Sequence, residues 1–265
     1  MSKWDFKEKI VLLTGAWGGL GREFTKQLLK AGAFLILTDI DEKELKSATN
    51  EILSSVKNSG GKILKIIGAA LSTERGCIEL FNKSREASKN FDCIIFNAGK
   101  LLYGNFHTVP QEKWEALISV NLLAPMRLTY LFLPDMLSRK EGRMVYICSI
   151  AGIVGTTQSV SYSASKFGLR GFAISLAEEI KKSGVKVTVV YPSWIDTPLL
   201  KTTPYGSLQP KTLQHVYVYP PEKIVKKVLT AVKKGKREVF PGLMPKIINF
   251  VNKFSPVVGS QRLNV

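Results

Sequence analysis

The sequence predicts a three-layer α/β sandwich, with helices on both faces of a doubly wound, mostly parallel sheet of about seven strands. Short β-branched or apolar runs alternate with longer amphipathic stretches, as in successive β-α-β units. Runs such as Ile10–Leu13 are apolar at consecutive positions, which is typical of parallel strands buried on both faces. With 265 residues, 45% of them apolar, the chain has the size of one such domain, expected over 1–265.

The elements follow one another in strand-helix order. The expected strands are Lys9–Thr14, Ala33–Asp39, Lys62–Ile67, Phe91–Phe96, Arg143–Cys148, Val185–Tyr191 and Glu238–Phe240. Amphipathic patterns predict helices over Leu20–Ala31, Glu42–Lys57, Glu74–Lys89, Pro110–Arg139, Val160–Ser183 and Pro221–Lys234.

Two segments do not follow the alternation. Ser193–Pro220 contains four prolines and has the length of a lid or binding loop, so we expect it to be the substrate loop. The tail 244–265 is basic and amphipathic, with apolar residues at helical spacing from Ile247 to Phe254. A helix there can close the substrate pocket, contact a partner subunit, or lie on a membrane.

The composition favours a reduced, cytoplasmic setting. Met1–Lys9 lacks the pattern of a signal peptide, and apolar stretches are interrupted before the roughly 18 residues that a membrane-spanning helix needs. Cys77, Cys93 and Cys148 are widely separated, and neither of the two histidines has a partner at metal-ligand spacing. No disulfide framework and no metal site are therefore expected.

The net charge of +17 is concentrated in the last quarter of the chain. Residues 201–265 contain 12 Lys and Arg against 2 acids. Such an excess can aid solubility, or it can attract phosphate-bearing substrates, anionic lipid or nucleic acid. No motif that reads RNA or DNA accompanies it, so any nucleic-acid binding is expected to be non-specific.

A glycine-rich turn follows the first expected strand and leads directly into a helix. Glycines permit a sharp turn and a close approach of the backbone to a pyrophosphate, and the helix N-terminus attracts that anion. This context predicts a Rossmann-type dinucleotide site rather than an ordinary tight turn. The residues of the turn expected to contact the cofactor are Gly15, Trp17, Gly18, Gly19, Leu20 and Gly21.

Asp39 ends the second expected strand, at the spacing where a carboxylate can hydrogen-bond both hydroxyls of an adenosine ribose. Its charge would repel a 2′-phosphate, and Gly18, before Gly19, offers no basic side chain to attract one. These residues predict a preference for NAD over NADP.

The glycine-rich turn has the pattern Thr-Gly-x-x-x-Gly-x-Gly, and Tyr162 and Lys166 form a Tyr-x-x-x-Lys pair. With these motifs the chain resembles the short-chain dehydrogenase/reductase family from about Lys7 to Pro241. The resemblance implies a catalytic set of Asn121, Ser149, Tyr162 and Lys166. It adds to the expected cofactor contacts Asn97, Ala98, Gly99, Tyr162, Lys166, Pro192, Ile195 and Thr197.

Tyr162 and Lys166 are four residues apart on an expected helix, so both side chains leave the same face. An ammonium about 5 Å from the phenol, at an effective dielectric of about 20, should stabilise the phenolate by roughly 3 kcal/mol and lower its pKa. Tyr162 is thus expected to act as acid and base. By the resemblance, Ser149 holds the reacting oxygen and Asn121 binds a water that connects Lys166 to solvent.

Two positions depart from the family pattern. Ala70 stands where an acidic residue commonly contacts the adenine, and Ser193 stands where glycine is usual. We therefore expect adenine to be held by the backbone and by Leu71.

The function expected from these residues is hydride transfer between NAD(H) and a secondary alcohol or ketone. Mainly apolar segments should wall the pocket, so an apolar or lipid-like substrate is expected. The expected apolar lining is Leu101, Leu102, Tyr103, Ile153, Val154, Trp194, Leu199 and Leu200. The alternative is a catalytically inactive NAD(P)-sensing protein. The long apolar helices and the resemblance also imply a homodimer or homotetramer.

Overall fold

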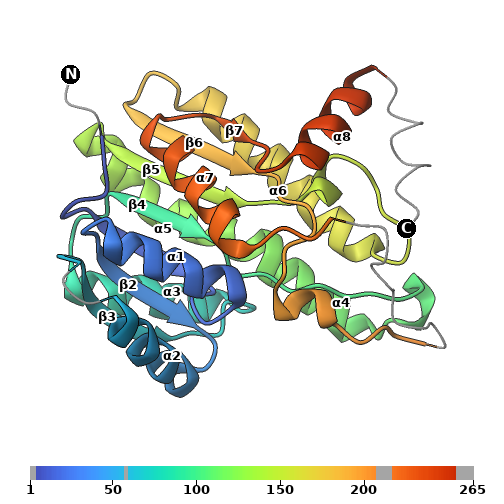
Figure 1. Ribbon diagram of the computed structural model, residues 1–265, viewed down its shortest axis with the longest axis horizontal. Coiled ribbons are helices and arrows are strands. Elements are labelled where there is room, and N and C mark those ends of the chain that lie inside the picture. The colour runs from blue at the N-terminus through green and yellow to red at the C-terminus, as the bar shows by residue number, and fades with distance from the viewer. Residues whose placement is uncertain (1–3, 57–58, 207–216, 255–265) are drawn as a thin grey trace.

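A computed structural model gives the fold and describes residues 4–56, 59–206 and 217–254 (Figure 1). Three expectations reach beyond this range. The end of the second expected helix at Lys57, residues 207–216 of the substrate loop and residues 255–265 of the tail lie outside the described residues.

Seven strands form one sheet in the order β3-β2-β1-β4-β5-β6-β7. Every neighbouring pair is parallel, so the prediction of a mostly parallel, doubly wound sheet is confirmed. The strand order reverses between β1 and β4. The strands are β1 (Ile10–Thr14), β2 (Phe34–Asp39), β3 (Lys62–Gly68), β4 (Cys93–Phe96), β5 (Gly142–Ile147), β6 (Val185–Val190) and β7 (Glu238–Val239).

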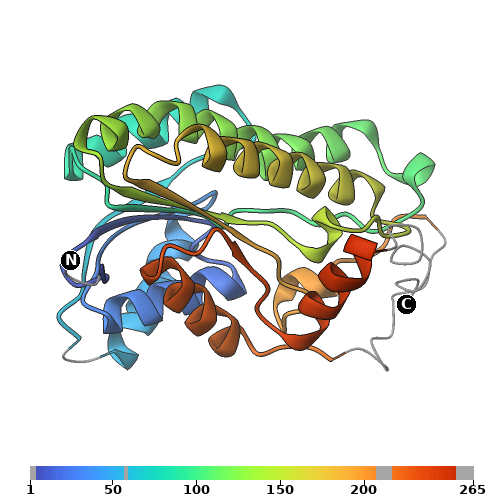
Figure 2. The ribbon, with the colours of Figure 1, turned by 90° about the horizontal axis from the view of Figure 1, so that it is seen from above.

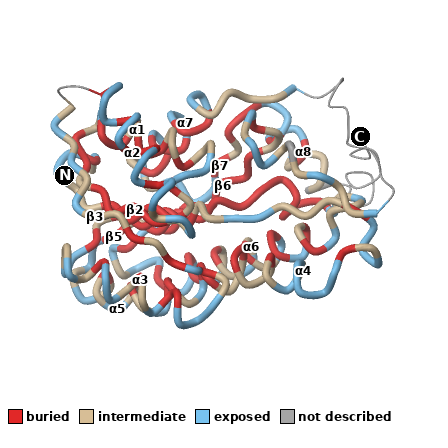
Figure 3. Tube along the Cα trace, turned by 90° about the horizontal axis from the view of Figure 1, so that it is seen from below, coloured by how far each residue is buried: buried red, intermediate tan, exposed pale blue. Residues whose placement is uncertain are grey.

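Helices cover both faces of the sheet, as expected for three layers (Figure 2). The helices of the described residues are α1 (Gly19–Lys30), α2 (Glu42–Ser55), α3 (Glu74–Ala87), α4 (Gln111–Ile118), α5 (Ala124–Arg139), α6 (Val160–Glu179), α7 (Pro221–Lys233) and α8 (Leu243–Phe254). Alternate strand residues point to opposite faces. Leu12 therefore packs in one buried core with residues of α3, α5 and α6, whereas Leu13 packs in a second core with residues of α1, α2 and α7 (Figure 3).

The expected continuous helix Pro110–Arg139 is divided. Pro110 is the N-cap of α4, and a π-helical turn at Ser119–Leu123 separates α4 from α5. A π turn contains one more residue than an α turn, so it shifts the side chains that follow around the helix axis. This turn contains the buried Asn121.

We expected no stretch long and apolar enough to cross a membrane, and this expectation was wrong. Within the described ranges, the helical segment Gln111–Arg139 satisfies both criteria. The packing of α5 on α3 and of α4 on α6 explains its apolar character, because these contacts bury apolar side chains of the segment.

Phe132 joins three parts of one core, and its removal should destabilise the fold. The ring is 1% exposed and makes edge contacts with Phe81 and Phe91 at centroid distances of 4.9 and 4.8 Å. Phe132→Ala is expected to lower the free energy of unfolding by about 3–5 kcal/mol. Denaturant unfolding measures this. Tyr130→Ala, on the same helix but 82% exposed, should change it by less than about 0.5 kcal/mol; equal losses would contradict the assignment.

Candidate active site

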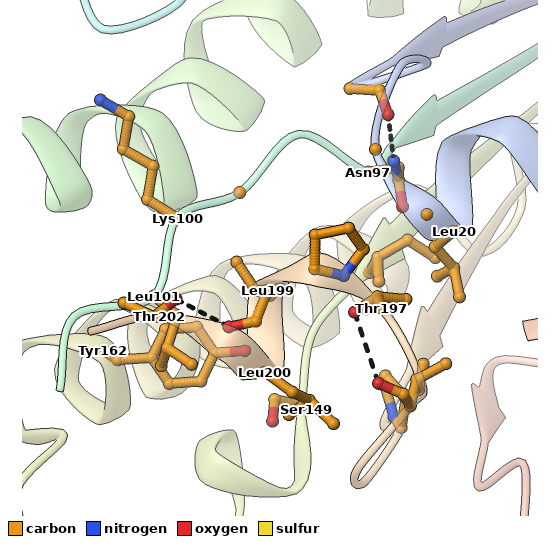
Figure 4. A pocket seen from close by; sticks show the side chains of 18 of the residues that line it. Leu20, Asn97, Lys100, Leu101, Ser149, Tyr162, Thr197, Leu199, Leu200 and Thr202 are labelled. Carbon is orange, nitrogen blue, oxygen red and sulfur yellow. Dashed lines mark hydrogen bonds between the residues drawn. The ribbon is translucent and has the colours of Figure 1, made fainter. Parts of the chain in front are cut away.

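A cavity of about 1180 Å³ opens at the carboxyl ends of the strands, where the strand order reverses between β1 and β4. Open α/β sheets bind ligands at this position. Figure 4 shows Ser149 and Tyr162 in one part of the cavity and Leu20 and Asn97 in another. The sequence-predicted residues that line it are Gly15, Trp17, Gly18, Gly19, Leu20, Gly21, Asp39, Asn97, Ala98, Gly99, Ser149, Tyr162, Lys166, Pro192, Ile195 and Thr197.

The turn between β1 and α1 leaves no room for side chains at two of its glycines. Gly15 has a φ of +66°, and a Cβ there would lie 2.7 Å from the Cα of Ala98. A Cβ on Gly21 would lie 2.0 Å from the carbonyl oxygen of Gly15. The backbone therefore packs more closely at Gly15 and Gly21 than any other residue permits, and these glycines present main chain to the cavity.

The N-terminus of α1 is suited to hold an anion. The N-caps of α2 and α3, Asp41 and Thr73, accept hydrogen bonds from backbone N–H groups inside their helices. The N-cap of α1 is Gly18, which has no side chain to do so, and the first turn of α1 contains no acidic residue. The helix dipole and the N–H groups thus face the cavity uncompensated, which fits a pyrophosphate.

Asp39 lies at the end of β2 and lines the same cavity. One carboxylate oxygen accepts the N–H of Trp17 at 3.0 Å, and the other accepts the N–H of Ile40 at 2.8 Å. These two bonds fix the plane of the carboxylate and leave further lone pairs for the hydroxyls of a ribose.

The ends of β1 and β4 are connected by Thr14, whose role the sequence reasoning missed. Its hydroxyl accepts the N–H groups of Asn97 and Ala98, both at 3.0 Å. In return the Asn97 amide donates to the carbonyls of Thr14 and Gly15, at 3.1 and 2.8 Å. The threonine of the Thr-Gly pattern was the available signal, although its partner strand is about 80 residues away.

Asn121 does not line the cavity but lies behind it. Its side-chain oxygen accepts the N–H of Lys100 at 2.8 Å, and its amide donates to the carbonyl of Lys100 at 2.9 Å and to the hydroxyl of Ser165 at 3.1 Å. The asparagine thereby holds the segment after β4 against α6. Ser165 had no signal in the sequence, because serine is common on helix surfaces.

Ser149, two residues past the end of β5, lies together with Tyr162 and Lys166 of α6. The Ser149 hydroxyl accepts the N–H of Ala151 at 3.1 Å and also hydrogen-bonds to Tyr162. Lys166 is 5% exposed, and its ammonium donates to the carbonyl of Ile147 at 2.9 Å. The same ammonium lies 5.6 Å from the centre of the Tyr162 ring.

The prediction that Lys166 lowers the pKa of Tyr162 was wrong for the protein without cofactor or substrate. Burial raises the pKa of Tyr162 to about 12, and the hydrogen bond from Ser149 opposes this rise only in part. Burial also lowers the pKa of Lys166. For the Tyr162 phenol, the loss of hydration outweighs the stabilising field of the Lys166 ammonium. That ammonium donates to the Ile147 carbonyl and lies over the face of the tyrosine ring.

The apolar end of the cavity agrees in part with the expected lining. Leu101, Tyr103, Trp194, Leu199 and Leu200 line it, and so does Leu71 near the expected adenine position. Ile153 and Val154 do not: they are 3% and 2% exposed and pack in the hydrophobic core beside α6. The short 3₁₀ turn Ile150–Gly152 turns the chain inward before them. Leu102 is also not part of the lining.

The chain belongs to the short chain dehydrogenase family, whose sequence profile matches residues 9–206. It is therefore an oxidoreductase. An uncharacterized oxidoreductase of Staphylococcus saprophyticus is 29% identical over 218 residues, which are 81% of this chain and 92% of that protein. Human epidermal retinol dehydrogenase 2 is 30% identical over 248 residues, which are 92% of this chain and 76% of that protein.

Solved structures agree with the fold. A metagenomic short-chain oxidoreductase in complex with NADP is 28% identical, with a TM-score of 0.71 over 90% of this chain and 99% of that chain. A short chain dehydrogenase/reductase from Burkholderia phymatum in complex with NAD has a TM-score of 0.82 over 97% of each chain, at 18% identity.

Two glycines of the turn should differ sharply in their tolerance of a methyl group. Gly21→Ala would force Cβ against the Gly15 carbonyl, whereas the nearest atom to a Cβ on Gly18 is 3.7 Å away, an ordinary contact. We expect Gly21→Ala to lose cofactor binding and thermal stability, and Gly18→Ala to keep both. Calorimetric titration and thermal denaturation measure these effects. Normal binding by Gly21→Ala would show that the turn does not form the cofactor site.

Proposed function

We propose that the protein transfers a hydride between NAD(H) and a secondary alcohol or ketone with an apolar body, and that Tyr162 exchanges the proton. The observation that carries the proposal is the single cavity that joins the bare glycine turn and Asp39 to Ser149, Tyr162 and Lys166. A nicotinamide dinucleotide, when bound, supplies the hydride donor or acceptor.

Each catalytic side chain has a role that follows from its surroundings. The Ser149 hydroxyl, held at the end of β5, orients the reacting oxygen next to the Tyr162 hydroxyl. Tyr162 donates a proton in reduction and accepts one in oxidation. Lys166 places a positive charge against the tyrosine ring and favours the phenolate that oxidation requires. Asn121 positions the chain around Lys166, since both approach Gly99.

NAD is the proposed cofactor in preference to NADP. The support is Asp39, whose fixed carboxylate fits two ribose hydroxyls and repels a 2′-phosphate. The related structures hold either cofactor, so their similarity favours neither.

The proposed substrate is apolar and lipid-like. Leucine, tyrosine and tryptophan side chains line the cavity beyond Ser149 and Tyr162. Epidermal retinol dehydrogenase 2, whose name specifies a long apolar alcohol, is among the relatives with 30% identity. We further propose a homodimer or homotetramer in the cytoplasm; the three cysteines are free and buried, which fits a reducing compartment.

Asp39→Ser tests the cofactor proposal. The loss of a charged acceptor for two ribose hydroxyls should weaken NAD binding roughly 10- to 100-fold. The same variant should bind NADP more tightly than the wild type does, because a repulsive charge is gone. Both dissociation constants are measured by titration calorimetry. Tighter binding of NADP than of NAD by the wild type would contradict the proposal.

Tyr162→Phe tests the chemistry. The variant should bind NAD as the wild type does and lose turnover by at least about 100-fold, because phenylalanine has no hydroxyl to exchange the proton. Tyr130→Phe, on the exposed side of α5, is the matched control and should remain fully active. The assay follows NADH with secondary alcohols and ketones of increasing chain length.

The outcomes of this assay separate the alternatives. Full activity of Tyr162→Phe would contradict the catalytic assignment. Turnover of small polar polyols alone would contradict the apolar substrate. Tight cofactor binding by the wild type with no turnover across the panel would favour an NAD(P)-sensing protein.

A further inference from the structure

Helix α8 presents an apolar face to the surface. Leu243, Ile247 and Phe250 are 68%, 45% and 63% exposed, and Met244 beside them is 38% exposed. These positions lie one turn apart, so they form a continuous stripe. The opposite face is used for packing: Ile248 is 7% exposed and belongs to the core that contains Ile150, next to Ser149. Helix α8 is therefore anchored to the core through Ile248, while the stripe on its other face is exposed.

The start of α8 is tied to the wall of the cavity. The Tyr219 hydroxyl accepts the N–H groups of Leu243 and Met244, at 3.1 and 3.3 Å. The Tyr219 backbone in turn donates to the carbonyl of Trp194 at 2.9 Å and accepts the N–H of Asp196 at 3.0 Å. Because Trp194 and Asp196 line the cavity, Tyr219 connects the start of α8 directly to residues of the cavity wall.

Both views of the ribbon place α8 at the same end of the molecule as the segment 198–206 (Figures 1 and 2). Leu199 of this segment lines the cavity and is 40% exposed. An apolar compound that leaves a surface in contact with α8 is thus already near the apolar lining of the site.

The charge of α8 favours an anionic bilayer over a second copy of the chain as the partner of the stripe. Helix α8 contains no acidic residue, and Lys246 is exposed beside Ile247. Like charges would oppose the pairing of two such surfaces, whereas an anionic bilayer attracts them and accepts apolar side chains.

We propose that α8 lays the stripe Leu243, Met244, Ile247 and Phe250 on an anionic lipid surface. The helix then sits in the interface plane, with its apolar side chains among the acyl chains and its lysine at the headgroups. The surface would supply an apolar substrate directly to the cavity, a consequence that rests on the proposed function; the binding itself does not.

Vesicle co-sedimentation of the full chain tests the proposal without substrate or cofactor. The probes are vesicles of phosphatidylcholine alone and vesicles of phosphatidylcholine with an equal amount of phosphatidylglycerol. The wild type should bind the mixed vesicles, bind the neutral ones weakly, and be released by high salt. Leu243→Asp/Ile247→Asp should lower affinity for the mixed vesicles by at least about 100-fold, since each substitution removes the burial of one aliphatic side chain.

The matched control is Leu53→Asp/Ile78→Asp, which adds the same charge at exposed apolar positions on α2 and α3. It should bind vesicles nearly as the wild type does. Equal binding by both double variants, or no binding by the wild type, would overturn the proposal. A change of oligomeric state confined to the α8 variant, measured by light scattering, would assign the stripe to a second copy and also overturn it. Turnover of a short, soluble alcohol by the α8 variant should stay unchanged, which separates this test from that of the catalytic site.

Discussion

The hydrogen bonds between the ends of β1 and β4 are the constraint on which the site depends. Thr14 and Asn97 exchange bonds across the point where the strand order reverses, so the two strand ends cannot separate. This contact brings Ala98 against Gly15 and allows no side chain there. The bare turn, the uncapped start of α1 and the cavity between them are consequences of one close approach.

Most of the fold could be predicted because its signals are local. Alternation of apolar runs and amphipathic stretches depends on neighbours within one element, and the seven strands lie within a few residues of their expected places. The division of Pro110–Arg139 could not be predicted. Its two halves pack on different helices, α5 on α3 and α4 on α6, and the apolar pattern of the segment does not reveal the extra residue of a π turn.

The proximity of the site residues could be predicted from the sequence, but their hydrogen-bond partners and pKa shifts could not. Sequence order places Ser149, Tyr162 and Lys166 at strand ends and on one helix face. It contains no information on the Ile147 carbonyl that accepts from Lys166, or on the Ser165 hydroxyl that holds Asn121, because these contacts arise only on packing. Desolvation is likewise a property of the assembled core, and it reverses the expected direction of the Tyr162 pKa.

Burial acts on Tyr162 and Lys166 in the same sense, since it disfavours the charged form of each. A phenolate without the ammonium, or an ammonium without a negative partner, is therefore costly in this site. The two opposite charges together offset one another's loss of hydration. The protonation states of Tyr162 and Lys166 are therefore coupled, because a charge on one lowers the cost of a charge on the other.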